Sequence, residues 1–138
     1  MIFEKNDIVK KDGNPYTVFT PYKKKWVEAF STLSIKNYQT EPLLKNCLHV
    51  KPFSLPDLQD IGFQKTDYDF PPLTINEEII KNYDQNRDYP YLEGTTRLGI
   101  HFRFGTISIR NAVQKAHELN RTWLNELIWR EFYMMILW

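Results

Sequence analysis

In the second half of the chain, apolar residues recur every three or four positions, a spacing typical of amphipathic helices. One helix is predicted after Ser108, its N-cap, with a buried stripe formed by Ile109, Ala112, Val113, Ala116 and Leu119. A second helix is predicted from Trp123 to the end of the chain, with Thr122 as N-cap. Both patterns favour a mainly α fold.

The first half of the chain carries different signals. Asp12-Gly13 stands between two β-prone runs and predicts a short β-hairpin within residues 2–19. A helix is expected next, with Thr20 as N-cap and an apolar side formed by Tyr22, Trp26, Phe30 and Leu33. The capping box that begins at Thr74 predicts a further helix to about residue 86.

Residues 34–73 show little hydrophobic periodicity. Only Ser54–Gly62 indicates a short helix, and the stretch is punctuated by Pro42, Pro52, Pro56, Pro71 and Pro72. A connector of this length is uncommon inside a compact domain. We therefore expect a long irregular linker, and the fold class is mainly α, with a short β-hairpin and this linker before a helical domain.

Composition limits the function classes. The 138 residues carry a net charge of +1, so a nucleic-acid site requires a local basic patch such as Lys23–Lys25, which also fits a solvated helix face. The single Cys47 excludes an internal disulfide framework and fits a reducing compartment. No apolar run approaches the ~20 residues of a membrane span, and the charged N-terminus does not resemble a signal peptide. We expect a cytoplasmic protein without a metal site, since the His and Cys residues lack ligand-like spacing.

The last predicted helix carries side chains suited to a planar ligand. Glu126, Trp129, Arg130 and Tyr133 share one face, because residues three, four and seven positions apart lie together on a helix. An indole can stack on a nucleobase, a carboxylate can accept from base N–H groups, and an arginine can pair with a phosphate. The same pattern also fits an ordinary amphipathic helix with core aromatics and an intrahelical pair of Glu and Arg.

The segment EGTTRLG, residues 93–99, carries donors for phosphate. Thr95 and Thr96 supply hydroxyl and backbone N–H groups, Arg97 supplies a guanidinium, and two glycines let the backbone bend. Such a turn can hold a phosphate or diphosphate. A polar turn between two helices explains the same residues.

These segments resemble the DNA photolyase and cryptochrome family. The resemblance is carried by RDYPYLEGTTRLGIHFRFGTISIR, by WLNELIWREFYMMIL after it, and by TVFTPYKKKW near the N-terminus. It implies three parts: residues 1–20 as the C-terminal remnant of an α/β domain, 21–73 as a helix and interdomain linker, and 74–138 as the truncated N-terminal part of a helical FAD-binding domain.

The resemblance also assigns functional positions. Glu126 matches the acid that hydrogen-bonds a flipped thymine dimer, and Trp129 matches the indole that packs against it, so both are expected to act in catalysis. Arg130 and Tyr133 fall, with these two, in the stretch that contacts DNA. The positions that match FAD contacts are Tyr83, Thr95, Thr96, Arg97, Leu98, Gly99 and Trp123. Gly99 stands where the family usually has Ser, so one hydroxyl donor is lost.

The chemistry that the resemblance implies is light-driven DNA repair. Excited reduced FAD gives an electron to a cyclobutane pyrimidine dimer, the ring splits and the electron returns; an antenna chromophore of unknown type belongs to the family's N-terminal domain. The rest of the flavin pocket would lie beyond Trp138. We expect the chain alone to bind FAD weakly or not at all and to repair nothing, and its apolar end YMMILW to favour self-association.

Two other function classes stay open. A cryptochrome-type blue-light signalling flavoprotein would keep the flavin and lose repair, although Glu126 and Trp129 favour repair. A non-catalytic truncated module would bind nucleic acid or a partner through Lys23–Lys25 and Arg130 without flavin.

Overall fold

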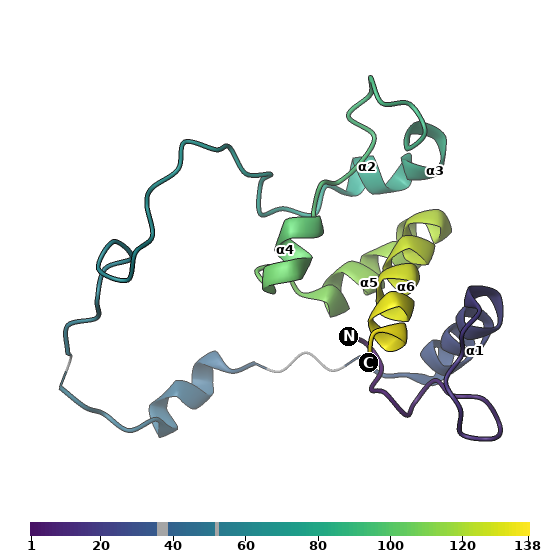
Figure 1. The fold of residues 1–138 in the computed structure, drawn as a ribbon, viewed down its shortest axis with the longest axis horizontal. Helices are drawn as coiled ribbons and strands as arrows, with labels where there is room; N and C mark the ends of the chain where they lie inside the picture. Colours follow the sequence, from purple (N-terminus) through teal and green to yellow (C-terminus); the bar gives the residue numbers. More distant parts are fainter. Residues whose placement is uncertain (36–38, 52) are drawn as a thin grey trace. The chain divides into compact units, whose positions relative to one another are not determined.

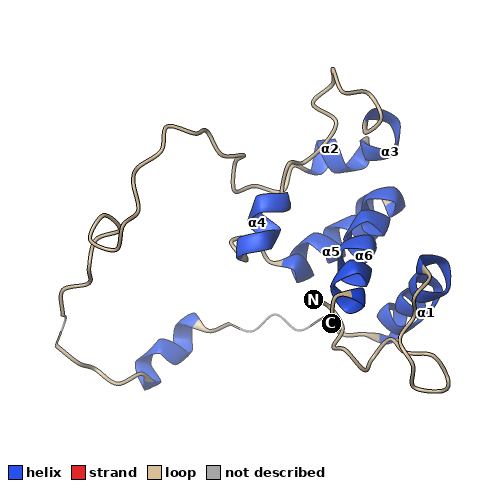
Figure 2. Cartoon of the chain, viewed as in Figure 1, coloured by secondary structure: helices blue, strands red, loops and turns tan. Residues whose placement is uncertain are grey.

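We describe the structure, a computed structural model, over residues 1–35, 39–51 and 53–138. Its helices are α1 (Phe19–Thr32), the 3-10 helix η1 (Glu41–Asn46), α2 (Glu77–Lys81), α3 (Tyr83–Asn86), α4 (Gly99–Phe104), α5 (Ile109–Leu119) and α6 (Arg121–Ile136) (Figures 1 and 2). No strand forms among these residues, which confirms the mainly α class. The described chain has two compact units, one made of Met1–Ser34 with Pro71–Trp138 and the other of Ile35–Phe70. The predicted boundaries at residues 20 and 73 stay a prediction.

The N-terminal residues form a tight turn in place of the expected hairpin. Val9 and Pro15 make one isolated antiparallel bridge, and the Lys10 N–H donates to Asn14 O at 2.9 Å. Gly13 occupies the turn with φ +80°, a conformation that glycine adopts without strain. Because Pro15 has no N–H, it cannot extend the ladder, so two paired strands do not develop.

Asparagine side chains cap two helices for which the sequence predicts threonine caps. Asn120 Oδ1 accepts from Thr122 N at 2.9 Å and Trp123 N at 3.1 Å, so Asn120 is the N-cap of α6 and Thr122 is not. Asn76, not Thr74, is the N-cap of α2 and accepts two backbone N–H groups of its first turn. In each case a neighbouring residue with a longer carbonyl-bearing side chain reaches the free N–H groups.

Of the other two predicted N-caps, one is confirmed and one is wrong. Ser108 caps α5 as predicted, because its Oγ accepts from Asn111 N at 3.4 Å. Helix α1 begins at Phe19 after Val18, without a side-chain cap, so Thr20 lies inside the first turn. Tertiary packing of α1 therefore replaces the expected cap as the source of its stability.

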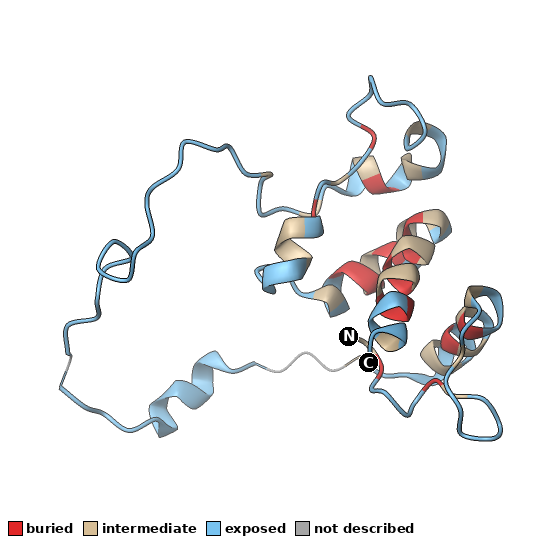
Figure 3. Cartoon of the chain, viewed as in Figure 1, coloured by how far each residue is buried: buried red, intermediate tan, exposed pale blue. Residues whose placement is uncertain are grey.

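The core lies among the N-terminal segment, α1, α2, α5 and α6 (Figure 3). Helices α5 and α6 pack together, and Ala112 and Ala116 on α5 are completely buried. Ile128 on α6 is also fully buried, and truncating such a residue to Ala costs about 2–5 kcal/mol. The α5 stripe predicted from periodicity thus faces the core, with Ile109 and Leu119 at its half-buried ends.

Among the residues that the structure describes, one charged side chain, Glu131, is buried within this core at 3% exposure. Its Oε2 accepts from Ile2 N at 2.6 Å, and its Oε1 accepts from Phe3 N at 3.2 Å and from Trp26 Nε1 at 3.0 Å. Three donors from two distant segments compensate the burial of the carboxylate. Glu131 therefore fixes the N-terminal segment and α1 onto α6, the helix that carries most of the candidate site.

Within Ile35–Phe70, the described residues form η1, turns and irregular chain. The expected short helix at 54–62 is a turn, in which Asp60 N donates to Asp57 O and Gly62 N to Gln59 O, each at 3.0 Å. Many of its apolar side chains are exposed, Leu48 and Phe53 among them, while Pro52 lies outside the described residues. None of the helices in the described parts of the chain combines the length and the apolar character needed to cross a membrane.

Candidate functional site

The turn Thr95–Gly99 is held at both ends by packing. Before the turn, Gly94 is buried against α3, and a Cβ at this position would lie 2.6 Å from Asn86 O. Only glycine allows this approach, because any side chain would force the backbones apart. Near the end of the turn, Leu98 is buried in the core at 1% exposure. The residues between them are therefore presented in a fixed place.

The exposed part of this turn presents hydrogen-bond donors. Thr95 and Arg97 are exposed, and Thr96 is half-buried. Arg97 adopts a positive φ of 51°, a strained conformation for a residue with a side chain. Its guanidinium pairs with Glu93 at 2.8 Å on the surface, and such exposed pairs are weak enough to exchange for another anion. Among the described residues, no backbone N–H of the turn donates to a protein acceptor, so the donor set fits a phosphate group.

Tyr83 begins α3 and is half-buried. Burial raises the pKa of its phenol, so the hydroxyl remains a donor at neutral pH. The guanidinium carbon of Arg87 lies 5.5 Å from the centre of the Tyr83 ring, within cation–π range. The two residues are four positions apart, one helical turn, and together form one face.

Arg87 also reaches α6. Its Nη1 donates to Glu126 Oε1 at 2.5 Å, and its Nε donates more weakly to Asp88 at 3.4 Å. The hydrogen bond to Glu126 raises the pKa of the Arg87 guanidinium. Glu126 Oε2 has no partner within the described part of the chain. The pair therefore orients Glu126 and leaves one carboxylate oxygen able to accept another hydrogen bond.

Trp129 is held by aromatic contacts. Its ring stacks on Phe19 with centroids 3.5 Å apart and planes 9° from parallel. Tyr133 lies one turn further along α6, 5.4 Å from the Trp129 ring and 24° from parallel, and is itself mostly exposed. Phe19 thus covers one face of the indole and the Tyr133 ring lies nearly parallel to it, so a planar ligand could meet Trp129 only where these two rings leave its surface open.

Arg130 does not bind Glu126, the intrahelical partner expected for an ordinary amphipathic helix. Its Nη2 donates to Phe102 O at 3.0 Å, near the end of α4, and its Nη1 contacts Met134 Sδ at 3.3 Å. The intrahelical pair between Glu126 and Arg130 is not formed, since Glu126 is paired with Arg87. Arg130 therefore attaches α4 to α6 and remains half-exposed.

The chain is similar to several curated enzymes named deoxyribodipyrimidine photo-lyase. It is 30% identical to the one from Alkalihalophilus pseudofirmus over 96% of this chain. Identity is 28% to the Halobacterium salinarum enzyme over 91% of this chain and 27% to the Escherichia coli enzyme over 88%. The chain belongs to the photolyase family. No protein-family profile matches it. It spans about a third of the length of these photolyases, 31%, 31% and 29% respectively.

Within this photolyase-family chain, the residues expected at the site fall into separate groups. The structure brings both Tyr83 and Glu126 into contact with Arg87, and places Trp129 beside Tyr133. Trp123, expected at the flavin, is buried in the core at 3% exposure. The roles assigned to these residues and to Thr95–Gly99 stay predictions.

Three residues that contact or support the predicted site positions are not indicated by the sequence patterns. Arg87 could have been found, since it lies one helical turn after Tyr83. Glu131 stands between Ile128 and Phe132, two buried apolar residues of α6. A charged residue at such a core position signals that its side chain needs hydrogen-bonding partners. Phe19 gives no such signal, because nothing in its neighbourhood in sequence relates it to Trp129.

Proposed function

We propose that this chain forms the lesion-contacting helix and part of the flavin-binding region of a photolyase that repairs cyclobutane pyrimidine dimers in DNA. The relatives named deoxyribodipyrimidine photo-lyase support the enzyme class. The observation that carries the proposal is the Arg87–Glu126 pair, which leaves Glu126 Oε2 free on the face of α6 that also holds Trp129.

FAD is the cofactor that the photolyase relationship implies, and the donors of the Thr95–Gly99 turn fit its diphosphate. The hydroxyls of Thr95 and Thr96 and the free backbone N–H groups of the turn would contact the phosphate oxygens, and Arg97 would exchange Glu93 for them. Tyr83 and an edge of Trp123 would bound the flavin. When bound, FAD supplies the light-driven electron transfer that splits the dimer.

The residues of this chain bind and position the lesion. Glu126 Oε2 accepts from an N–H on the edge of a flipped pyrimidine, while Arg87 holds the other oxygen. Trp129, fixed by Phe19, packs against the flipped bases with its free surface. Extruding a base costs a few kcal/mol, and less at a damaged, poorly paired site, so these contacts can offset the cost. Arg130 and Tyr133 lie next along the same helix and would contact the flanking DNA.

A repair assay on the complete gene product tests this proposal. The protein is reconstituted with reduced FAD and mixed with an oligonucleotide that contains one thymine dimer, and the restored thymines are counted by chromatography. We expect repair under blue light and none in the dark. Absence of repair while the flavin is still photoreduced would overturn the proposal and favour the signalling class of protein.

A further inference from the structure

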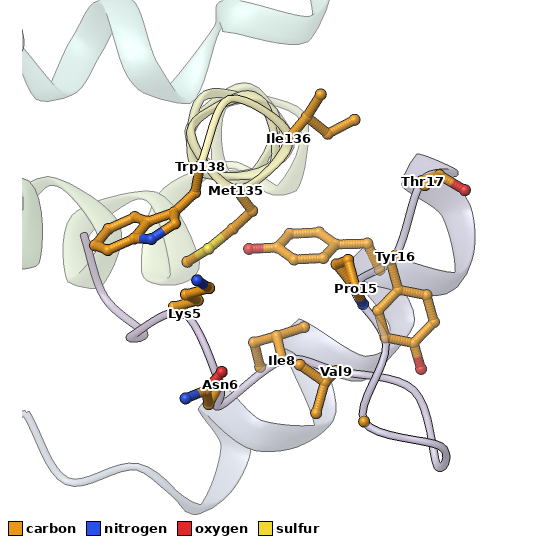
Figure 4. Close-up of a pocket in the computed structure, with 12 residues that line it drawn as sticks. Lys5, Asn6, Ile8, Val9, Pro15, Tyr16, Thr17, Met135, Ile136 and Trp138 are labelled. Atoms are coloured by element: carbon orange, nitrogen blue, oxygen red, sulfur yellow. The ribbon is translucent and has the colours of Figure 1, made fainter.

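A cavity of about 260 Å³ lies between the N-terminal turn and the end of α6 (Figure 4). It shares no lining residue with the candidate photolyase site. Its walls are mainly apolar, and the labelled side chains of Ile8, Val9, Pro15 and Met135 are among them. The volume is slightly below the roughly 300 Å³ at which pockets for drug-sized ligands begin, so it suits a molecule with one ring.

Tyr22 forms part of the wall of this cavity and provides its unusual polar feature. The residue is 1% exposed, and its hydroxyl is buried without a hydrogen-bond partner among the described residues. Buried hydroxyls normally have a partner, because an unmade hydrogen bond is unfavourable. Met135 also lines the cavity, and its flexible side chain can adjust to admit a ligand atom. The Tyr22 hydroxyl therefore lacks a hydrogen-bond acceptor, and a ligand in the cavity could provide one.

The charges around the cavity limit what that ligand can be. The charge of Glu131 contributes, after burial, to raising the pKa of Tyr22, so a carboxylate lies near the hydroxyl and disfavours a second anion there. Lys5 and Trp138 also line the cavity, and Lys5 Nζ lies 5.6 Å from the centre of the Trp138 ring in a cation–π contact. An uncharged acceptor on a flat apolar body fits these surroundings.

We propose that this cavity binds an uncharged single-ring aromatic carbonyl compound, whose carbonyl oxygen accepts a hydrogen bond from the Tyr22 hydroxyl. The apolar walls take the ring, and the carbonyl supplies the one acceptor that the cavity lacks. The inference is independent of the photolyase function, since none of its residues belongs to that site.

Three probes of nearly equal size test the proposal by ligand-observed NMR titration of the 138-residue chain. Acetophenone carries the carbonyl, α-methylstyrene replaces that oxygen by a CH₂ group, and benzoate carries a negative charge. We expect acetophenone to bind saturably, and about threefold to tenfold more tightly than α-methylstyrene, the range for one net hydrogen bond. Benzoate should bind more weakly than acetophenone. Absence of saturable binding, or tighter binding of benzoate, would overturn the proposal.

Two matched substitutions test whether Tyr22 is the donor to the ligand carbonyl. Tyr22→Phe should abolish the advantage of acetophenone over α-methylstyrene and leave the free chain as stable as before or more stable, because it removes an unpartnered hydroxyl. Tyr16→Phe changes a half-exposed phenol on the same cavity and should leave the advantage intact. If the advantage survives in the Tyr22→Phe chain with its fold unchanged, the proposal is wrong.

Discussion

Arg87 Nη1 lies 2.5 Å from Glu126 Oε1, and this contact joins α3 to α6 across 39 positions of sequence. Both side chains are partly exposed, so the pair contributes little to stability, roughly 0.5 kcal/mol after solvent screening. Its main effect is to orient Glu126, which keeps its second carboxylate oxygen accessible for a ligand donor. The geometry thus favours a role in binding over a role in folding.

Substitution of Glu126 by Gln should weaken binding of dimer-containing DNA to the complete gene product. The amide replaces one carboxylate oxygen by an N–H₂ group, which faces either Arg87 or the base edge with the wrong polarity. We expect a loss of affinity of about tenfold or more, the range for a hydrogen bond to a charged group. Fluorescence anisotropy of a labelled oligonucleotide measures it. Glu118→Gln on the exposed face of α5 is the control, and equal affinities for the two variants would contradict the role of Glu126.

Removal of the Glu131 carboxylate should destabilise the compact unit made of Met1–Ser34 and Pro71–Trp138. Glu131→Ala leaves the N–H groups of Ile2, Phe3 and Trp26 buried without their acceptor. We expect a loss of about 3–5 kcal/mol in the free energy of unfolding. Urea unfolding followed by circular dichroism measures this quantity, and Glu118→Ala should change it by less than about 0.5 kcal/mol. A loss below 1 kcal/mol for Glu131→Ala would argue that water replaces the carboxylate.

The 138-residue chain by itself should bind FAD weakly or not at all. The turn Thr95–Gly99 offers donors for the diphosphate, but Trp123 is buried and provides little surface for the isoalloxazine ring. Quenching of flavin fluorescence during titration with the chain measures the affinity, and the longer Escherichia coli photolyase, one of its relatives, serves as the comparison. Tight, stoichiometric binding by the 138-residue chain would contradict this prediction.

The ion pair between Lys115 on α5 and Glu77 on α2 should make stability depend on acidic pH. The hydrogen bond from Lys115 lowers the pKa of Glu77 below its ordinary value of 4.5. A depressed carboxyl pKa stabilises the fold above the unfolded pKa, and this stability is lost as the pH falls through the folded pKa. Lys115→Met should therefore lower the melting temperature at pH 6, and the difference from the native chain should shrink below pH 4.5. Lys24→Met on the exposed side of α1 should show no such pH-dependent difference.

Helix positions were predictable because their signals are local. The apolar stripe of α5 and its Ser108 cap formed as predicted, since both depend on residues within a few positions of one another. The caps at Thr74 and Thr122 were wrong because Asn76 and Asn120 stand within two positions of them and compete for the same N–H groups. Asn120 is also held from outside its helix, since its Nδ2 donates to Lys81 O and Asp84 Oδ1. Local patterns do not contain that second set of contacts.

The sequence by itself determined the helical class, the face shared by Glu126, Trp129 and Tyr133, and the motifs that relate the chain to photolyases. These follow from side-chain spacing and from the order of short segments. Only the tertiary structure decided that Arg87 holds Glu126, that Phe19 covers Trp129, and that Glu131 is buried against Ile2, Phe3 and Trp26. The physical reason is separation: partners 39 to 129 positions apart are brought together by packing of the whole core, and no spacing rule specifies which of several carboxylates or aromatics will meet.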